Sequence, residues 1–134
     1  MMSGIRGKNT KPEMLLRSAL HRRGFRFRIH DKRLPGRPDI VFPGPHAVVF
    51  VHGCFWHGHD GCRYFKVPDT RQDFWLAKIR GNQARDARAI EALEEAGWRV
   101  AVVWECATRN RPDAAVETVE AWIRGKDREL VVAE

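Results

Sequence analysis

A chain of 134 residues, of which 43% are hydrophobic, can bury the core of one domain and is too short for two, so we expect a single domain over residues 1–134. No apolar run approaches the roughly 20 residues that a bilayer span needs, and the start of the chain lacks an apolar signal core, so we expect a soluble cytoplasmic protein with no membrane partner. Lysine and arginine outnumber aspartate and glutamate by 24 to 17, and the net charge of +7 favours a polyanionic partner such as nucleic acid without establishing one.

The first part of the chain predicts one helix and three strands. Thr10 and Glu13 have the spacing of a capping box around a first-turn proline, an apolar stripe follows, and Gly24 ends the helix. A turn at 34–38 and a reversal at 43–45 then separate short β-like runs. The predicted elements are a helix from Thr10 to Gly24 and strands over residues 25–29, 39–42 and 47–51.

The second part of the chain predicts an irregular segment followed by alternating helices and strands. Residues 53–69 are rich in glycine, histidine and cysteine, which is typical of a loop with a bound ion or site. The remaining predicted elements are a helix over 70–96 with a break near Gly81, a strand over 98–104 and a helix over 114–123. We expect residues 1–9 to form a flexible basic segment and residues 126–134 a flexible tail.

Two of these strands define the expected location of the site. The strands at 47–51 and 98–104 are joined through a helix, so they should be parallel. Their carboxyl ends then lie at the same edge of the sheet, where open α/β sheets usually carry their sites. His52 follows the first strand and Cys106 the second, so we expect these two residues to lie close together.

The three cysteines of the chain gather at this edge together with histidines. Three cysteines cannot form an even set of disulfides, which favours metal binding or burial. Cys54, His59 and Cys62 are spaced so that they can fold around one ion, and Cys106 would complete the set, since a structural zinc takes about four nitrogen or sulphur ligands. The alternative is three unrelated buried thiols. We predict a structural Zn²⁺ site.

An aspartate is expected at the end of the same sheet. Counting outward from the turn at residue 44, Asp39 lies opposite Phe50 and within two residues of Val51 and His52. A carboxylate, a backbone carbonyl and an imidazole would thus converge, which suits Mg²⁺ and the cleavage of a phosphodiester, with His52 or His57 accepting a proton from the attacking water. The alternative is an aspartate that only caps a turn or faces solvent.

Four sequence motifs resemble those of one known family, the very-short-patch (Vsr) DNA mismatch repair endonucleases. These are bacterial enzymes that nick one DNA strand beside a T:G mismatch arising from deamination of 5-methylcytosine. The likeness runs in order from about Ile5 to Gly125. The motifs are Leu34-Pro35-Gly36-Arg37-Pro38-Asp39, His52-Gly53-Cys54-Phe55-Trp56-His57, Phe65-Lys66-Val67-Pro68 and Val103-Trp104-Glu105-Cys106.

The resemblance implies a fold and a set of site residues. The fold would be restriction-endonuclease-like, an α/β fold of three layers with a mixed central sheet flanked by helices and with a structural zinc site. Asp39 and the carbonyl of Val51 would bind Mg²⁺, with His57 as general base or acid and His52 as its partner at the phosphate. Glu13 would approach the water shell of the metal, or act only in the capping box. The implied zinc ligands are Cys54, His59, Cys62 and Cys106.

The resemblance also implies contacts with double-stranded DNA. Phe55, Trp56 and Trp75 would form a wedge that opens the base stack, which costs least at a mismatch. A place in the core is the alternative for all three aromatics, and for Trp75 the two readings have equal weight. Arg37 and Lys66 are the other predicted DNA contacts. A monomer is expected, with mismatch-repair proteins as further partners.

Two departures from the family pattern leave questions open. The family often has four histidines after the position of Trp56, whereas here one residue more precedes Cys62, so His57 and His59 are exchangeable as zinc ligand and catalytic group. The family also commonly begins with an additional basic segment, without which weaker DNA affinity or mismatch preference is expected. The competing functions are a related endonuclease for other DNA substrates and a non-catalytic, zinc-stabilised DNA-binding module.

Overall fold

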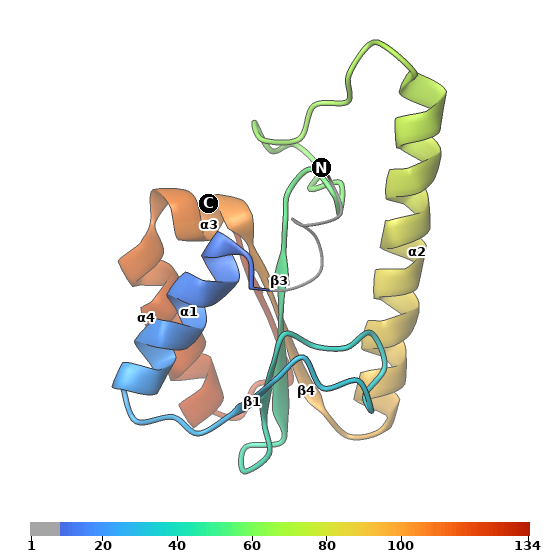
Figure 1. Ribbon diagram of the computed structural model, residues 1–134. Helices are drawn as coiled ribbons and strands as arrows, with labels where there is room; N and C mark the ends of the chain where they lie inside the picture. Colours follow the sequence, from blue (N-terminus) through green and yellow to red (C-terminus); the bar gives the residue numbers. More distant parts are fainter. Residues whose placement is uncertain (1–8) are drawn as a thin grey trace.

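The fold is built on one five-stranded mixed sheet, as the computed structural model of residues 9–134 shows (Figure 1). The predicted basic segment lies outside the described residues except for Asn9. The strands lie side by side in chain order, and they are β1 (Arg28–Ile29), β2 (Ile40–Phe42), β3 (Ala47–His52), β4 (Arg99–Trp104) and β5 (Glu129–Val132).

The pairing of neighbouring strands changes from antiparallel to parallel at β3. The pairs β1–β2 and β2–β3 are antiparallel, whereas β3–β4 and β4–β5 are parallel. Val51 aligns with Val103 and His52 with Trp104, so the carboxyl ends of β3 and β4 lie at one edge of the sheet. The predicted parallel pairing of these two strands is therefore confirmed.

Helices cover both faces of the sheet (Figure 1). Helix α1 begins after Thr10, whose side chain accepts the Glu13 N–H at 3.4 Å and supplies the predicted N-cap. Within the described part of the chain, no helix is both long enough and apolar enough to cross a bilayer. The helices are α1 (Lys11–Arg22), α2 (Gln72–Glu95), α3 (Glu105–Asn110) and α4 (Pro112–Arg124).

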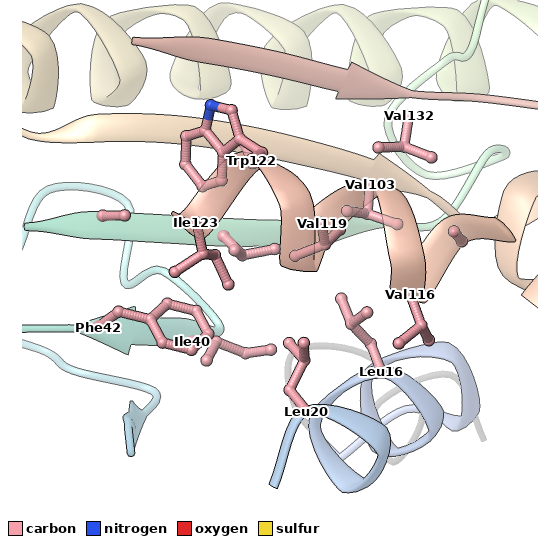
Figure 2. Close-up of a cluster of buried hydrophobic side chains, with 14 of the residues drawn as sticks. Leu16, Leu20, Ile40, Phe42, Val103, Val116, Val119, Trp122, Ile123 and Val132 are labelled. Carbon is pink, nitrogen blue, oxygen red and sulfur yellow. The ribbon is translucent and has the colours of Figure 1, made fainter. Parts of the chain in front are cut away.

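Two hydrophobic cores follow from the alternation of side chains along the strands. Ile40 and Val49 face α1 and α4, and Figure 2 shows Leu16 and Leu20 of α1 in the same cluster. Val48 and Phe50 face the opposite way and pack with Leu93 of α2. Each fully buried aliphatic or aromatic side chain contributes about 1.5–3 kcal/mol, so the two cores fix the sheet between its helices.

Two strands differ from the prediction: β1 is shorter than expected, and β5 was expected to be a flexible tail. Residues 25–27 do not extend β1, whose pairing with β2 is limited to Arg28 and Ile29; β2 itself ends at Phe42, so residues 25 and 26 have no strand opposite them. The predicted flexible tail at 126–134 is wrong in its second half, since Glu129–Val132 forms β5 against β4. Val132 is buried there, and β5 pairs with an edge of β4 that would otherwise be open.

The helices also differ from the prediction in two places. The break expected near Gly81 is wrong, because α2 runs unbroken through it. A glycine inside a helix costs only about 1 kcal/mol, which good helix formers on both sides offset. Helix α3 was not expected, and it buries Cys106 and Ala107 directly after β4.

Gly36 fixes the turn that leads into the predicted metal ligand Asp39. Its φ of +74° lies in the left-handed region, and a Cβ there would lie 2.6 Å from Cβ of Ala89 on α2 and 3.2 Å from the Phe50 ring. Any side chain at this position would push the turn away from α2. Glycine therefore lets the segment before β2 pack closely against the helix.

Candidate functional site

The predicted site residues come together at the carboxyl ends of β3 and β4. The segment between β3 and α2 contains no helix or strand, as predicted for residues 53–69. Its side chains divide between a cysteine-rich cluster beside α3 and a group of histidines and carboxylates between β3 and α2.

The first cluster contains three cysteines and one histidine. One ligand atom from each of Cys54, His59, Cys62 and Cys106 lies within 4.8 Å of all the others. Nδ1 of His59 is 3.6 Å from Sγ of Cys54 and 3.6 Å from Sγ of Cys106. Zn–S and Zn–N bonds in a tetrahedron place sulphur and nitrogen about 3.6 Å apart, so the spacing fits one ion. This cluster can bind a metal ion.

The surroundings of the sulphur atoms also suit a metal. Each one accepts a backbone N–H: Cys54 from Cys106 at 3.3 Å, Cys62 from Tyr64 at 3.5 Å and Cys106 from Glu134 at 3.4 Å. Such bonds stabilise thiolates in metal sites. Burial raises the pKa of the Cys54 thiol, so a thiolate at this position needs a cation beside it.

His57 and His59 point to different clusters although only Gly58 separates them. The His59 ring stacks on Trp104 at 4.1 Å beside the cysteines. Gly58 has a φ of +62°, and a Cβ there would lie 2.7 Å from Cγ2 of Ile79, so only glycine lets the chain turn this close to α2. The structure thus places His59, and not His57, among the cysteines.

The second cluster contains His52, His57 and an aspartate of α2. The two imidazole rings stack at 3.9 Å with an angle of 4° between their planes. Nδ1 of His57 lies 2.6 Å from Oδ2 of Asp86, and Nε2 of His52 lies 4.0 Å from Oδ1 of the same carboxylate. Asp86 therefore orients the His57 ring and fixes which of its nitrogens faces away from α2.

Asp86 was missed by the sequence prediction, which treated α2 only as a helix with one apolar stripe. A signal was present in the polar residues Asn82 and Gln83, which lie four and three residues before Asp86 and so share a helix face with it. The Asn82 amide donates to the Trp56 carbonyl at 2.8 Å, and the Gln83 amide donates to the Gly58 carbonyl at 3.1 Å. This face of α2 fixes the backbone of the loop as well as the His57 ring.

His52 is a buried imidazole. Burial lowers its pKa to about 3, with the charge of His57 adding to this fall and Asp86 opposing it. His52 is therefore neutral over the physiological pH range, and it offers a hydrogen bond rather than a positive charge.

Asp39 lies where the sequence placed it. Its Oδ2 accepts the Val51 N–H at 2.6 Å, and the β2–β3 register, continued by one residue, sets it opposite Phe50. The same register sets Pro38 opposite Val51. Because N–H and C=O of a strand residue point the same way and proline has no N–H, the Val51 carbonyl receives no ladder hydrogen bond from Pro38. It remains available to a cation beside Asp39.

Glu13 is a buried carboxylate with three partners. Arg17 donates to it at 2.7 Å, the Asn9 N–H donates at 2.9 Å, and Nε2 of His30 lies 2.5 Å from its Oε2. The reciprocal half of the capping box is not formed, since the carboxylate bonds to Asn9 rather than to Thr10. Glu13 thus faces the site and still belongs to the capped first turn of α1.

The carboxylates of buried Glu13 and half-buried Asp39 lie near one another. Ligand atoms of Glu13, His30 and Asp39 all lie within 4.8 Å of each other. Burial raises the pKa of Asp39 to about 7, with the charge of Glu13 adding to this rise and the Val51 N–H opposing it. A divalent cation would relieve the cost of ionising Asp39, so the arrangement suits one.

The predicted aromatic wedge residues contact one another beside this site. Phe55 and Trp56 meet edge to face at 5.0 Å, and Trp75 lies 5.6 Å from Phe55 and 5.9 Å from Trp56. All three are half-buried and belong to neither hydrophobic core. Phe74, which the prediction left aside, contacts Trp75 at 5.1 Å and is exposed.

The two predicted basic DNA contacts are both exposed. Arg37 lies in the turn before β2 with a φ of 49°, a left-handed conformation that is rare for arginine. Lys66 lies in the segment between the cysteine cluster and α2. Their exposure leaves both free to contact a phosphate backbone.

Comparison with known proteins agrees with the four motifs. A family model described as DNA mismatch endonuclease Vsr matches residues 1–63. The DNA mismatch endonuclease Vsr of Escherichia coli (strain K12) is 49% identical over 129 residues, which cover 93% of this chain and 82% of that protein. This chain belongs to the Vsr family.

Other relatives are described as nicking enzymes. The type II nicking enzyme V.XorIIP of Xanthomonas oryzae pv. oryzae is 58% identical over 106 residues, or 79% of this chain and 77% of that enzyme. The type II nicking enzyme V.NmeAIP of Neisseria meningitidis is 48% identical over 111 residues, or 83% of this chain and 79% of that enzyme. The predicted resemblance to Vsr endonucleases is confirmed.

Proposed function

We propose that this Vsr-family protein is a DNA endonuclease that nicks one strand beside a T:G mismatch and requires Mg²⁺. Two observations carry the proposal: the Asp39 carboxylate accepts the Val51 N–H near the end of β3, and the His57–Asp86 pair lies beside His52, the last residue of that strand. Family membership supports the nicking activity and its place in mismatch repair. The family also implies the restriction-endonuclease-like arrangement, and we propose that the chain acts as a single-domain monomer.

The metal-binding part of the site would consist of Asp39, the Val51 carbonyl and, nearby, Glu13. Carboxylate and carbonyl oxygens are the ligands that Mg²⁺ prefers, and it commonly keeps positions for water and substrate phosphate. Bound at these residues, Mg²⁺ would neutralise the negative charge that develops on the scissile phosphate. The raised pKa of Asp39 supports this assignment, because a buried carboxylate without a cation is costly to ionise.

The proton-transfer part of the site would consist of His57 and Asp86. Asp86 holds Nδ1 of His57 at 2.6 Å, which leaves Nε2 of the ring to accept a proton from the attacking water. The same carboxylate would stabilise the imidazolium that results. His52, which stays neutral beside the His57 ring, would donate a hydrogen bond to the phosphate.

We propose that Cys54, His59, Cys62 and Cys106 hold a structural Zn²⁺. The four side chains supply a complete tetrahedral set of soft ligands and leave no position for substrate, which is the pattern of structural zinc sites. The ion would join the loop after β3 to α3. It would thereby fix His57, only two residues from His59, at the catalytic centre.

The proposed DNA contacts are the three half-buried aromatics Phe55, Trp56 and Trp75, with Arg37 and Lys66 on the phosphate backbone. Insertion of an aromatic side chain costs a few kcal/mol of base unstacking, and least at a mismatch, so the wedge would favour T:G over a matched pair. Replacement of Trp56 by alanine should therefore reduce the preference for T:G more than it reduces binding of matched DNA.

A nicking assay on two duplexes that differ only in one T:G or T:A pair tests the proposal, with and without Mg²⁺. We expect one nick beside the mismatch, which needs Mg²⁺, and little cleavage of the T:A duplex. Equal nicking of both duplexes would reject the mismatch preference and favour an endonuclease for other DNA. No nicking of either duplex at any Mg²⁺ concentration would favour a non-catalytic DNA-binding module.

A further inference from the structure

His30 lies directly beside the proposed catalytic centre, although the proposed function gives it no role. It follows β1, and its backbone N–H donates to the Asp39 carbonyl at 3.1 Å. This bond continues the register in which Ile29 aligns with Ile40. His30 is therefore the cross-strand neighbour of Asp39. Its φ of 51° is left-handed, and that conformation directs the chain away from the sheet at this point.

The imidazole of His30 lies close to both carboxylates, that of buried Glu13 and that of half-buried Asp39. Nε2 is 2.5 Å from Oε2 of Glu13, and the ligand atoms of Glu13, His30 and Asp39 lie within 4.8 Å of one another. The side chain of His30 is 17% exposed and that of Glu13 only 1% exposed. Two ligands of one small divalent cation lie at most about 4.2 Å apart, so side-chain shifts of less than about 1 Å would close this group on an ion.

Glu13 does not require His30 to balance its charge. Arg17 already forms an ion pair with it at 2.7 Å, and the Asn9 N–H binds its other oxygen. The Glu13 carboxylate therefore has a hydrogen-bond donor on each oxygen without the His30 ring. The unmatched charge belongs to Asp39, whose carboxylate accepts a hydrogen bond only from the N–H of Val51 among the described residues.

We infer that His30 is a nitrogen ligand of the cation site formed with Glu13 and Asp39. The inference rests on the proposed function, because it concerns the same metal as the proposed Asp39 site. Oxygen-only sites suit Mg²⁺, whereas an imidazole adds affinity for first-row transition metals. The site then binds Mn²⁺ more tightly than Mg²⁺, and His30 sets that preference.

Electron paramagnetic resonance of bound Mn²⁺ tests the inference without reference to nicking. The zinc-loaded protein is titrated with Mn²⁺ in the absence of DNA, with its Cys–His cluster already filled. We expect one Mn²⁺ site with a nitrogen hyperfine coupling in the pulsed spectrum. His30→Gln keeps a hydrogen-bonding group for Glu13 and removes the imidazole, so it should abolish that coupling and weaken Mn²⁺ binding by about tenfold, with a smaller effect on Mg²⁺.

His46→Gln is the matched control. His46 also has a left-handed φ, of 59°, but it lies at the opposite end of β3, exposed and stacked on Trp98 at 3.8 Å. This variant should retain the nitrogen coupling and the Mn²⁺ affinity. A wild-type spectrum without nitrogen coupling, an absence of bound Mn²⁺, or unchanged coupling in His30→Gln would overturn the inference.

Asp39→Asn separates this inference from the proposed function. If Asp39→Asn abolishes Mn²⁺ binding and nicking while His30→Gln leaves both unchanged, only the role of His30 is wrong. If Asp39→Asn retains Mg²⁺-dependent nicking, the proposed catalytic site itself is wrong. If both substitutions abolish the nitrogen coupling and only Asp39→Asn abolishes nicking, the inference and the proposed function both hold.

Discussion

The cysteine cluster and the Asp39 site both lie at the end of the sheet. They differ in how many of their polar groups already have hydrogen-bond partners within the protein. In the cysteine cluster, each sulphur accepts a backbone N–H, and the four side chains have the spacing of one tetrahedral ion. At the end of β3, by contrast, Asp39 is half-buried with a raised pKa, and the Val51 carbonyl lacks a ladder donor from Pro38. The cysteine cluster lacks only an ion, whereas Asp39 and the Val51 carbonyl offer just two oxygen ligands, so a cation there would also take water or substrate oxygens.

This difference shows how a short loop serves structure and chemistry together. His57 and His59 lie on either side of Gly58, one held by Asp86 and the other stacked on Trp104. The left-handed turn at Gly58 directs them to separate clusters. A metal ion in the cysteine cluster would fix the proposed catalytic imidazole, two residues from His59, far better than a free loop would.

Replacing His59 or His57 singly by glutamine should produce the largest effects. His59→Gln should lose the bound zinc and lower the free energy of unfolding by at least about 4 kcal/mol, because metal binding contributes directly to folding. The matched His57→Gln should keep the zinc and most of the stability but lose nicking. Metal content and thermal unfolding distinguish the two, and loss of zinc in His57→Gln would show that the assignment is reversed.

Removal of the Asp39 charge should abolish activity and leave the zinc cluster intact. We expect Asp39→Asn to slow nicking by about 10³-fold, since metal ions stabilise the transition state by several kcal/mol. Asp113→Asn, an exposed substitution on α4, is the control and should nick at the wild-type rate. Single-turnover rates at saturating Mg²⁺ measure the difference. A reduction of less than tenfold would exclude Asp39 as a metal ligand.

The raised pKa of Asp39 predicts a pH-dependent cost in the absence of divalent cations. The carboxyl is protonated in the folded state up to about pH 7, but in the unfolded chain it ionises at the ordinary aspartate pKa of 3.8. The stability that its protonated form contributes is complete below pH 3.8 and is lost as pH rises through 7. Asp39→Asn should therefore gain roughly 2–4 kcal/mol over the wild type between pH 4 and pH 8.

Chemical denaturation in a chelator that spares the zinc measures this gain. Mg²⁺ should reduce the difference between the two proteins, because it stabilises the ionised wild-type carboxylate and has no such partner in the variant. An equal stability difference at both pH values would mean that Asp39 is not buried as a carboxylate in the metal-free protein.

The smallest effect is expected at Asp86, which acts through His57. Asp86→Asn should slow nicking by between about tenfold and 10²-fold and leave the Mg²⁺ dependence and zinc content unchanged. Asp73→Asn, at the exposed start of the same helix, is the control. The pH profile of the rate should change only in Asp86→Asn, since a role limited to helix stability would leave that profile as it is.

Much of the site was predictable because local patterns determine it. The turn at 43–45 fixes the register of β2 and β3, and that register alone places Asp39 opposite Phe50. The parallel pairing of β3 and β4 follows from the helix between them, and it brings Cys106 to Cys54. Spacing along the chain was sufficient for both.

The parts that were missed depend on contacts between distant segments. Asp86 lies 29 residues after His57 on a long helix, and only the packing of α2 against β3 brings the two together. His30 contacts Glu13 across 17 residues, through the pairing of a two-residue strand that has little signal of its own. Four residues are too few for the sequence pattern to distinguish β5 from a flexible tail. The strand forms through its pairing with β4, a contact between segments distant in the sequence.

The most direct test of the account is a comparison of Asp39→Asn, His57→Gln and the double variant in single-turnover nicking of a T:G duplex with Mg²⁺. If both side chains act on one phosphate, the double variant should be about as slow as the slower single variant, because residues that act as a unit are not additive. If the two rate losses simply multiply, the carboxylate and the imidazole act independently, and the proposed shared centre at the end of β3 is contradicted.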